Sequence, residues 1–385
     1  MPRFEARELS TVVDGETERF HLLEDNDTGS RVIVAHRGAS LQQYAASFER
    51  FGKGLGLVDL CYSHFNWADF QRGMPRQQVR DVPDAETLVM GTTLMRLKPT
   101  WAGDAWLGSI NRFIGGTGAI LDDHGAVRRH LTALVNHPDS GSYLHDATMG
   151  MVADLIDVYA GDDFAYVEFE MPMGTGFESG YPEGVKAVLR YTLTPEMLTD
   201  GQRLVNGSEI AVPMTFGRHS SRRVGASPVD RHILQAQAIH YLETEAVTNN
   251  PTGRLAGAAG LIPYLEPLGD RRLDHTLVLT HPLVRLISAD TGFGLETEAT
   301  DRYSLQETVW THNLSLPEHP GYARQFVACE RLCKNHAAAT HYAGRIPQEE
   351  LPDALRQLCL PAGQAYDAVR AMRPMMSWTN RDLPQ

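Results

Sequence analysis

The chain of 385 residues is 42% hydrophobic and carries 35 Lys and Arg against 48 Asp and Glu, a formal net charge of -13. It is long enough to bury a large core, but it has no basic surface that would collect phosphates or anionic lipids, so nucleic acids and membranes are not expected partners. The start of the chain is polar where a secretory signal needs about 7 to 15 apolar residues, and no segment reaches the roughly 18 apolar residues of a membrane span. We therefore expect a cytoplasmic protein with reduced cysteines.

Short apolar or alternating runs recur along the chain, separated by clusters of Gly, Pro, Asn and Asp. This pattern is typical of many short antiparallel strands in a sandwich or barrel, so the sequence predicts an all-β fold. The strand-like runs are residues 31–36, 56–62, 86–99, 185–194, 275–289 and 303–311. The turn clusters are residues 23–30, 136–142, 171–184 and 248–253.

Helical patterns are few. Residues 40–52 and 124–136 each have apolar spacings that fit two or three helical turns, and residues 349–358 fit a late helix. Neither an internal repeat nor a linker marks a boundary along the chain. We therefore expect one domain over residues 1–385, with a few short helices beside the strands.

Several polar or ionisable residues stand beside turns or at strand ends, where they would face a pocket. For each one a structural explanation comes first: an arginine is usually on the surface, one of 16 histidines usually makes a single structural hydrogen bond, and an Asp–His pair is common at a strand end. Taken singly, none of them identifies a reaction. They are Asn111, Arg112, His145, His219, Asp274 and Glu330.

Glu330 is the strongest single candidate. It interrupts the apolar run 326–329 within a predicted strand, and a buried carboxylate costs free energy unless it is paired or used. Half of the residues on such a strand face solvent, so the position alone is an even choice between a surface glutamate and a catalytic one.

The order and spacing of these segments carry more information than any one of them. From about residue 10 to residue 370 the chain resembles the aldose 1-epimerase (galactose mutarotase) family. The resemblance is carried by Asn111-Arg112, Leu144-His145, residues 191–194 (Tyr-Thr-Leu-Thr), His219-Ser220, residues 250–253 (Asn-Pro-Thr-Gly), Asp274-His275, residues 305–308 (Leu-Gln-Glu-Thr), Cys329-Glu330-Arg331 and residues 360–366.

The resemblance implies a galactose mutarotase-like β-supersandwich with an open cleft, acting on a small-molecule carbohydrate. Glu330 would be the general base that removes the proton from the anomeric hydroxyl, and His219 the general acid that protonates the ring oxygen. The family uses neither a metal nor another cofactor, and we expect a monomer or homodimer. The positions implied to bind the sugar are Asn111, Arg112, His145, Asp274 and Gln306.

This assignment is chemically consistent. Opening a hemiacetal ring requires removal of a proton at O1 and supply of a proton at O5, and paired acid and base groups perform both transfers. Rotation about C1–C2 then exposes the other face of the aldehyde, and the reverse transfers close the opposite anomer. The reaction predicted from the resemblance is therefore interconversion of α and β anomers.

The segment around His219 departs from the family's pattern. Arg218 precedes the histidine, and Ser221-Arg222-Arg223 replaces the family's Tyr-Phe-Asn. Three arginines would disfavour a protonated histidine and would suit a phosphorylated or acidic sugar, unless they point to solvent or pair with nearby acids. If the segment is shifted, His232 or His240 is the acid instead.

Other functions remain open at this stage. Asp274 and Glu330 would be the two carboxylates of a glycoside hydrolase. The acid–base pair of an epimerase would also serve a biosynthetic isomerase, cyclase or lyase acting on a sugar-derived or lactol substrate. A protein that retains the sandwich and binds carbohydrate without turnover is the non-enzymatic alternative.

A zinc site is the remaining alternative. Cys329, Cys333, His336 and His341 supply suitable ligands, but their spacing differs from the paired pattern of structural zinc. A strand would also direct Cys329 away from the face of Glu330. We therefore favour two buried thiols and two surface histidines, and expect no metal.

Overall fold

The computed structural model describes the backbone of more than half of the chain. The described residues are 2–13, 16–61, 104–107, 112–114, 117–121, 127–132, 142–144, 151–173, 182–213, 217–244, 246, 251–263, 265–301, 305–311, 327–332, 350, 352–353 and 358–377. Within this part nearly all regular structure is β-strand, and the helical element with defined bounds is the three-residue turn η4 (Val229–Arg231). The all-β prediction is confirmed.

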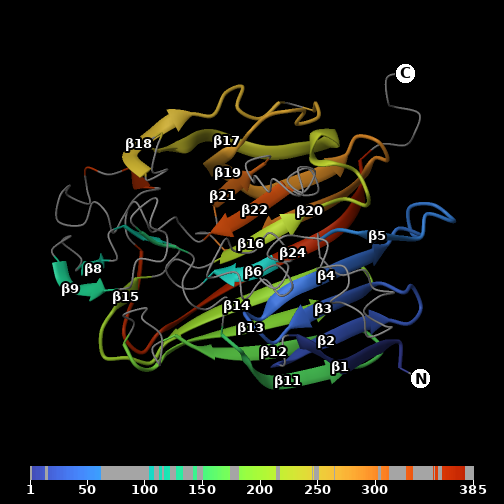
Figure 1. Cartoon of the computed structure of the whole chain (residues 1–385), viewed down its shortest axis with the longest axis horizontal. Helices are drawn as coiled ribbons and strands as arrows, with labels where there is room; N and C mark the ends of the chain where they lie inside the picture. The colour runs from blue at the N-terminus through green and yellow to red at the C-terminus, as the bar shows by residue number, and fades with distance from the viewer. Residues whose placement is uncertain are drawn as a thin grey trace.

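The N-terminal strands form an antiparallel meander, shown in blue in Figure 1. Each strand pairs with the next, from β1 to β5. Their bounds are β1 (Phe4–Val13), β2 (Glu16–Asp25), β3 (Arg31–Ala35), β4 (Ser40–Ser47) and β5 (Leu57–Asp59).

A second meander follows in the middle of the chain and ends on the C-terminal strand. β11 pairs with β12, β12 with β13, β13 with β14, and β14 with β24. The bounds are β11 (Asp154–Ala160), β12 (Ala165–Pro172), β13 (Val185–Leu193), β14 (Leu198–Asn206) and β24 (Ala365–Met376).

A third group of strands connects the two meanders. From β4 the pairing continues through β6, β16, β22, β21, β19 and β20 to β24, while β17 and β18 extend the sheet beyond β19. In Figure 1, β6 and β16 lie between the blue strands and the orange strands β19 to β22. The bounds are β6 (Asp104–Leu107), β16 (Gly217–Arg222), β17 (His232–Thr244), β18 (Pro251–Gly257), β19 (Asp274–Ser288), β20 (Phe293–Ala299), β21 (Gln306–Trp310) and β22 (Val327–Leu332).

Three small ladders complete the described structure. β7 (Arg112–Ile114) pairs with β10 (Ser142–Leu144), β8 (Thr117–Leu121) with β9 (Val127–Thr132), and β15 (Val212–Pro213) with β23 (Cys359–Leu360). Among the described residues, no pairing joins any of these three ladders to the large sheet.

The core lies between the two meanders. Residues alternate between buried and half-buried along β12, β13 and β14, as expected for strands with one face inward. Phe169 and Leu189 from these strands share one hydrophobic cluster with Val34 and Leu41 of the N-terminal meander. Each such side chain stabilises the fold by roughly 1.5–3 kcal/mol. The two meanders are therefore layers of a sandwich.

The helix predicted over residues 40–52 is wrong, because residues 40–47 form β4. Leu41, Tyr44, Ala45 and Phe48 have the i, i+3, i+4, i+7 spacing of a helix face. Nearly every residue of β4 is buried on either face, however, so the strand has no visible alternation. Pairing with β3 and β5 decides the conformation.

The helix predicted over residues 124–136 is also wrong where it is described, since residues 127–132 form β9 in a hairpin with β8. Most of the helix predicted over residues 349–358 lies outside the described residues. The strands predicted over 31–36, 185–194, 275–289 and 303–311 are confirmed in their main parts by β3, β13, β19 and β21. The run 56–62 is confirmed in part, by β5 over Leu57–Asp59, and the run 86–99 lies outside the described residues.

Candidate active site

The register of β16 against β22 brings together the two residues expected to exchange protons. His219 and Glu330 are direct partners in this antiparallel ladder. Residues directly opposite each other share one face of a sheet, with Cβ atoms about 4.5–5.5 Å apart. An acid and a base at these two positions would therefore address the same small volume above the sheet.

The same row of the sheet continues across two more strands. Thr308 of β21 is the partner of Glu330, and Thr276 of β19 is the partner of Thr308. The two threonine hydroxyls are 2.7 Å apart and hydrogen-bonded to each other. Sequence reasoning missed both threonines, although Thr308 lies two residues after Gln306 on a strand and therefore on the same face.

Two of the expected sugar-binding residues lie on this face in the neighbouring rows. Gln306 begins β21 and Asp274 begins β19, and each is two residues from the threonine of its own strand. Gln306 is only 2% exposed, whereas Asp274 is exposed. The face that carries His219 and Glu330 thus has a shielded amide on one side and a solvent-accessible carboxylate on the other.

Shielding extends over much of this face. Ser221, Trp310 and Thr276 all share it, and they are 0%, 8% and 8% exposed, respectively. Polar groups screened from water interact more strongly with a bound partner than exposed ones do, because the local dielectric is lower. Ser221 and Thr276 are therefore polar groups in such an environment.

The opposite face of β16 is locked to the other layer of the sandwich. Arg218 donates from Nη2 and Nε to the two carboxylate oxygens of Asp200 on β14, at 2.7 and 2.9 Å. Arg370 of β24 makes a second ion pair with Asp200 at 3.0 Å. All three side chains are at most 2% exposed. This cluster fixes the position of β16, and therefore of the backbone of His219, relative to β14 and β24.

The arginines near His219 therefore have structural partners. Arg222 is 2% exposed and donates to Ser220 Oγ (2.9 Å) and to the sulfur of Met372 (3.0 Å). Arg223 donates from Nε to the carbonyl of Gly225 (2.6 Å). Because Arg218 and Arg222 alternate with His219 along β16, they lie on the other face and do not provide an anion site beside it.

A second buried ion pair supports the neighbouring strands. Arg331 of β22 bonds through Nε to Glu307 of β21, and through Nη1 to the carbonyl of Pro282 in β19 (2.6 Å). The two side chains are 4% and 3% exposed. This pair crosslinks the three strands that carry Glu330, Gln306 and Asp274, on the face away from the row.

Of the remaining expected site residues, Arg112 begins β7 and is the partner of Leu144 at the end of β10. Asn111 and His145 lie outside the described residues. Among the described residues, no pairing connects the β7–β10 ladder to the row of His219 and Glu330.

His232 is not available as a substitute acid. It is 0% exposed, its Nδ1 bonds to the carbonyl of Pro228 (2.9 Å), and its Nε2 accepts from the amide of Val224 (3.1 Å). Burial lowers its pKa to about 4. His240 is half-buried on β17, which pairs with β19 and not with β16.

The alternative zinc ligands are only partly described. Cys329 is 5% exposed and alternates with Glu330 along β22, so it lies on the opposite face, as expected for a buried thiol. Cys333, His336 and His341 lie outside the described residues.

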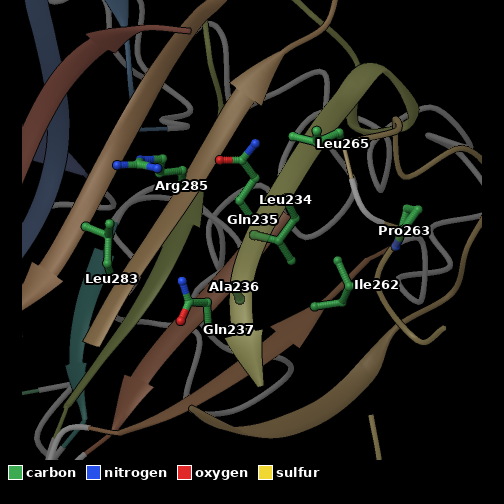
Figure 2. A pocket seen from close by; sticks show the side chains of 9 residues that line it. All are labelled: Leu234, Gln235, Ala236, Gln237, Ile262, Pro263, Leu265, Leu283 and Arg285. Carbon is green, nitrogen blue, oxygen red and sulfur yellow. The ribbon is translucent and has the colours of Figure 1, made fainter. Parts of the chain in front are cut away.

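A cavity of about 230 Å³ opens elsewhere, between β17, β19 and the loop after β18. Figure 2 shows its lining, which is mainly apolar, with Gln235, Gln237 and Arg285 as the polar members. Arg285 is paired with Glu296 on β20 (2.9 Å). Among the described lining residues there is no acid–base pair.

Comparison with known proteins identifies the fold. No protein-family model and no curated protein matches the sequence. A galactose mutarotase-like protein from Clostridium acetobutylicum superposes with a TM-score of 0.67 and 12% identity, over 97% of this chain and 99% of the other. Galactose 1-epimerase from Lactobacillus acidophilus gives 0.68 and 16%, over 97% and 100%. An aldose epimerase homologue from C. elegans gives 0.61 and 14%, over 97% and 99%.

These similarities establish the architecture. The chain has the sandwich fold of galactose mutarotase-like proteins, as the resemblance in sequence predicted. At 12–16% identity the superpositions describe the fold alone. Among the described residues, no helix has the length and apolar character needed to cross a membrane.

Proposed function

We propose that this galactose mutarotase-like protein is an isomerase of the aldose 1-epimerase type, which interconverts the α and β anomers of a sugar. Glu330 is the general base at the anomeric hydroxyl and His219 is the general acid at the ring oxygen. The observation that carries the proposal is the register of β16 and β22, in which these two residues are direct partners.

The chemistry requires such a pair. The hydroxyl oxygen O1 and the ring oxygen O5 are both bonded to C1, so the groups that exchange protons with them must reach two neighbouring atoms. Cross-strand partners on one face, with Cβ atoms about 4.5–5.5 Å apart, meet this requirement. Removing the proton at O1 while supplying one at O5 breaks the C1–O5 bond, and the reverse transfers re-form it on the other face.

The substrate is proposed to be a small carbohydrate held by hydroxyl-binding groups. Gln306 on the shielded part of the face and Asp274 at its exposed end provide amide and carboxylate partners for sugar hydroxyls. Thr276 and Thr308 add two hydroxyls in the same row. We propose that Arg112 together with Asn111 and His145 also contributes to binding, on the basis of the family resemblance.

Glycoside hydrolysis by Asp274 and Glu330 is less compatible with the register. β21 lies between their strands, and Asp274 is aligned with a position two residues away from Glu330. With strands about 4.8 Å apart and a rise of about 3.4 Å per residue, their Cα atoms are roughly 12 Å apart. The carboxyl groups of glycosidases are about 5–5.5 or 6.5–9.5 Å apart, so these two side chains would have to lean toward each other across β21, whereas Glu330 and His219 are direct partners.

Anomer exchange tests the proposal directly. Freshly dissolved α-D-galactose and α-D-glucose are followed by NMR or polarimetry with the wild-type protein and with Glu330→Gln. We expect the protein to accelerate exchange, and Glu330→Gln to reduce kcat by about 10² to 10⁴, the usual contribution of a positioned base. His219→Gln should cause a loss of the same order.

The control is Glu243→Gln, which changes the same functional group in an exposed ion pair with Arg254 on β17 and β18. It should leave the rate unchanged. If Glu330→Gln is folded, with an unchanged unfolding midpoint, and retains full activity, Glu330 is not the base. If the wild-type protein binds sugars but leaves exchange at the buffer rate, the protein is a carbohydrate-binding protein without this turnover.

A further inference from the structure

Three potential metal ligands converge at the N-terminal edge of the sandwich, away from the row of His219 and Glu330. Glu8 of β1 is the direct partner of His21 of β2. His36 follows β3 and lies two residues beyond Val34, the partner of His21, so it falls on the same face. One ligand atom from each of the three residues lies within 4.8 Å of the other two.

The two imidazoles face each other through their nitrogens. His21 Nδ1 and His36 Nε2 are 3.0 Å apart, and the ring centroids are 5.1 Å apart. Two imidazole nitrogens on one tetrahedral zinc ion, each bonded at about 2.0–2.1 Å, are about 3.3 Å apart. The observed separation is therefore within about 0.3 Å of the one that both nitrogens would have on a single ion in place of the proton that they share.

The surroundings hold these rings in place. Phe169 packs edge-on against both imidazoles, with centroids at 5.1 Å from His36 and 6.3 Å from His21. Arg37, next to His36, is neutralised by its ion pair with Glu18 (2.7 Å). Phe169 therefore restricts the orientation of both rings, which reduces the entropy that metal binding would otherwise cost.

Both histidines are buried, at 4% and 1% exposed, whereas Glu8 is exposed. The cluster therefore has a carboxylate on its solvent side. The 3.0 Å contact between the rings joins the same two nitrogens that an ion would take, His21 Nδ1 and His36 Nε2.

We propose that Glu8, His21 and His36 bind one divalent transition-metal ion, with zinc as the best fit to two imidazoles and one carboxylate. The fourth position, on the solvent side of Glu8, is filled by water. The ion would join β1, β2 and β3 and so stabilise the edge of the sandwich. The two histidines are 15 residues apart and form no short ligand-spacing motif, which is why the sequence predicts no metal here.

Metal titration of the full chain provides the test. The protein is stripped with a chelator, and zinc chloride is titrated calorimetrically, with cobalt chloride as a spectroscopic probe of imidazole coordination. We expect one zinc ion per chain at this site and a rise in the unfolding midpoint with zinc. Glu8→Gln should weaken binding at least about tenfold, since even indirect ligands of metal sites contribute 10- to 100-fold.

Two further variants make the result specific. Glu5→Gln makes the same change on the same strand, but Glu5 lies on the other face and pairs with Arg7 (3.1 Å), so binding should be unchanged. Glu8→His supplies a third imidazole at an exposed position and should restore tight binding. Absence of zinc binding, or zinc binding that is equal in wild type, Glu8→Gln and Glu5→Gln, would overturn the proposal.

Discussion

The hydrogen bonds of His232 in the folded protein require its neutral form. Its Nδ1 donates to the carbonyl of Pro228, and its Nε2 accepts from the amide of Val224, so both nitrogens have partners only while Nε2 is unprotonated. Burial is the main cause that lowers its pKa to about 4, and nearby Arg223 acts in the same direction. The residue therefore couples stability to pH.

The direction of the pH effect on stability follows from the pKa of this histidine in the folded and unfolded states. The unfolded histidine titrates near pH 6.5 and the folded one near pH 4, so between these values the unfolded chain binds more protons and stability falls as the pH is lowered. At pH 5 this coupling lowers the free energy of unfolding by roughly 2 kcal/mol relative to neutral pH. We expect His232→Gln to be less stable at neutral pH but to lose less stability on acidification.

Urea unfolding of wild type and His232→Gln at pH 7.5 and pH 5 measures this effect, because the difference between the two proteins removes the contribution of other groups. Equal losses on acidification in both proteins would show that His232 is not the coupled group.

From the sequence, the residues of the candidate site could be recognised individually as polar residues in strands, but their positions relative to one another could not be predicted. Glu330 interrupts an apolar strand, and Gln306 and Asp274 begin strands, so each is identifiable as a polar residue that requires a partner. That His219 is the partner of Glu330 depends on the register between two strands far apart in the chain. Sequence patterns determine which face a residue occupies within one strand, but not which strand lies beside it.

At the scale of elements, β16 is held by charge as well as by backbone pairing. Asp200 accepts from Arg218, from Arg370 and from Gln202 Nε2 (3.0 Å), in a region where the side chains of Asp200 and Arg218 are fully buried. Removing one partner from a buried ion pair leaves an uncompensated charge and costs about 3–5 kcal/mol.

We expect Asp200→Asn to lower the free energy of unfolding by about 3–5 kcal/mol, because two buried guanidinium groups lose their shared counter-charge. The matched control is Asp290→Asn, which breaks a 2.7 Å ion pair with Arg231. In this pair the side chain of Arg231 is 48% exposed and that of Asp290 is 40% exposed. It should cost under about 1 kcal/mol. Denaturant unfolding of both variants checks the difference, and equal costs would mean that the buried cluster is not what holds β16 to β14.

The elements themselves were predicted best where one face is inward and the other outward. β13 alternates between buried and half-buried over its whole length, and its run was recognised as a strand. β4 is buried on both faces and was taken for a helix, because its apolar spacing fits both periods. Burial on two faces is a property of the assembled layers and is not encoded in the local pattern.

At the scale of the molecule, the C-terminal strand joins the parts of the fold. β24 pairs with β14 on one side and with β20 on the other, and the hydroxyl of Tyr44 in β4 reaches the carbonyl of Met372 at 3.4 Å. Met372 is 0% exposed and lies in the same hydrophobic cluster as residues of the N-terminal meander. On this basis we propose that residues 1–385 form one domain.

If the chain is one domain, a destabilising substitution in β24 also destabilises the N-terminal strands. Met372→Ala should lower the free energy of unfolding by about 2–5 kcal/mol, as for other buried large-to-small changes. The slowest amides exchange only by global unfolding, so their hydrogen exchange should accelerate as much in β3 as in β19. Val369→Ala, on the same strand but 37% exposed, should change exchange little in either strand. If Met372→Ala accelerates exchange in β19 and leaves the slowest amides of β3 unaffected, the two regions unfold separately, and the N-terminal meander would have to be treated as an independent domain.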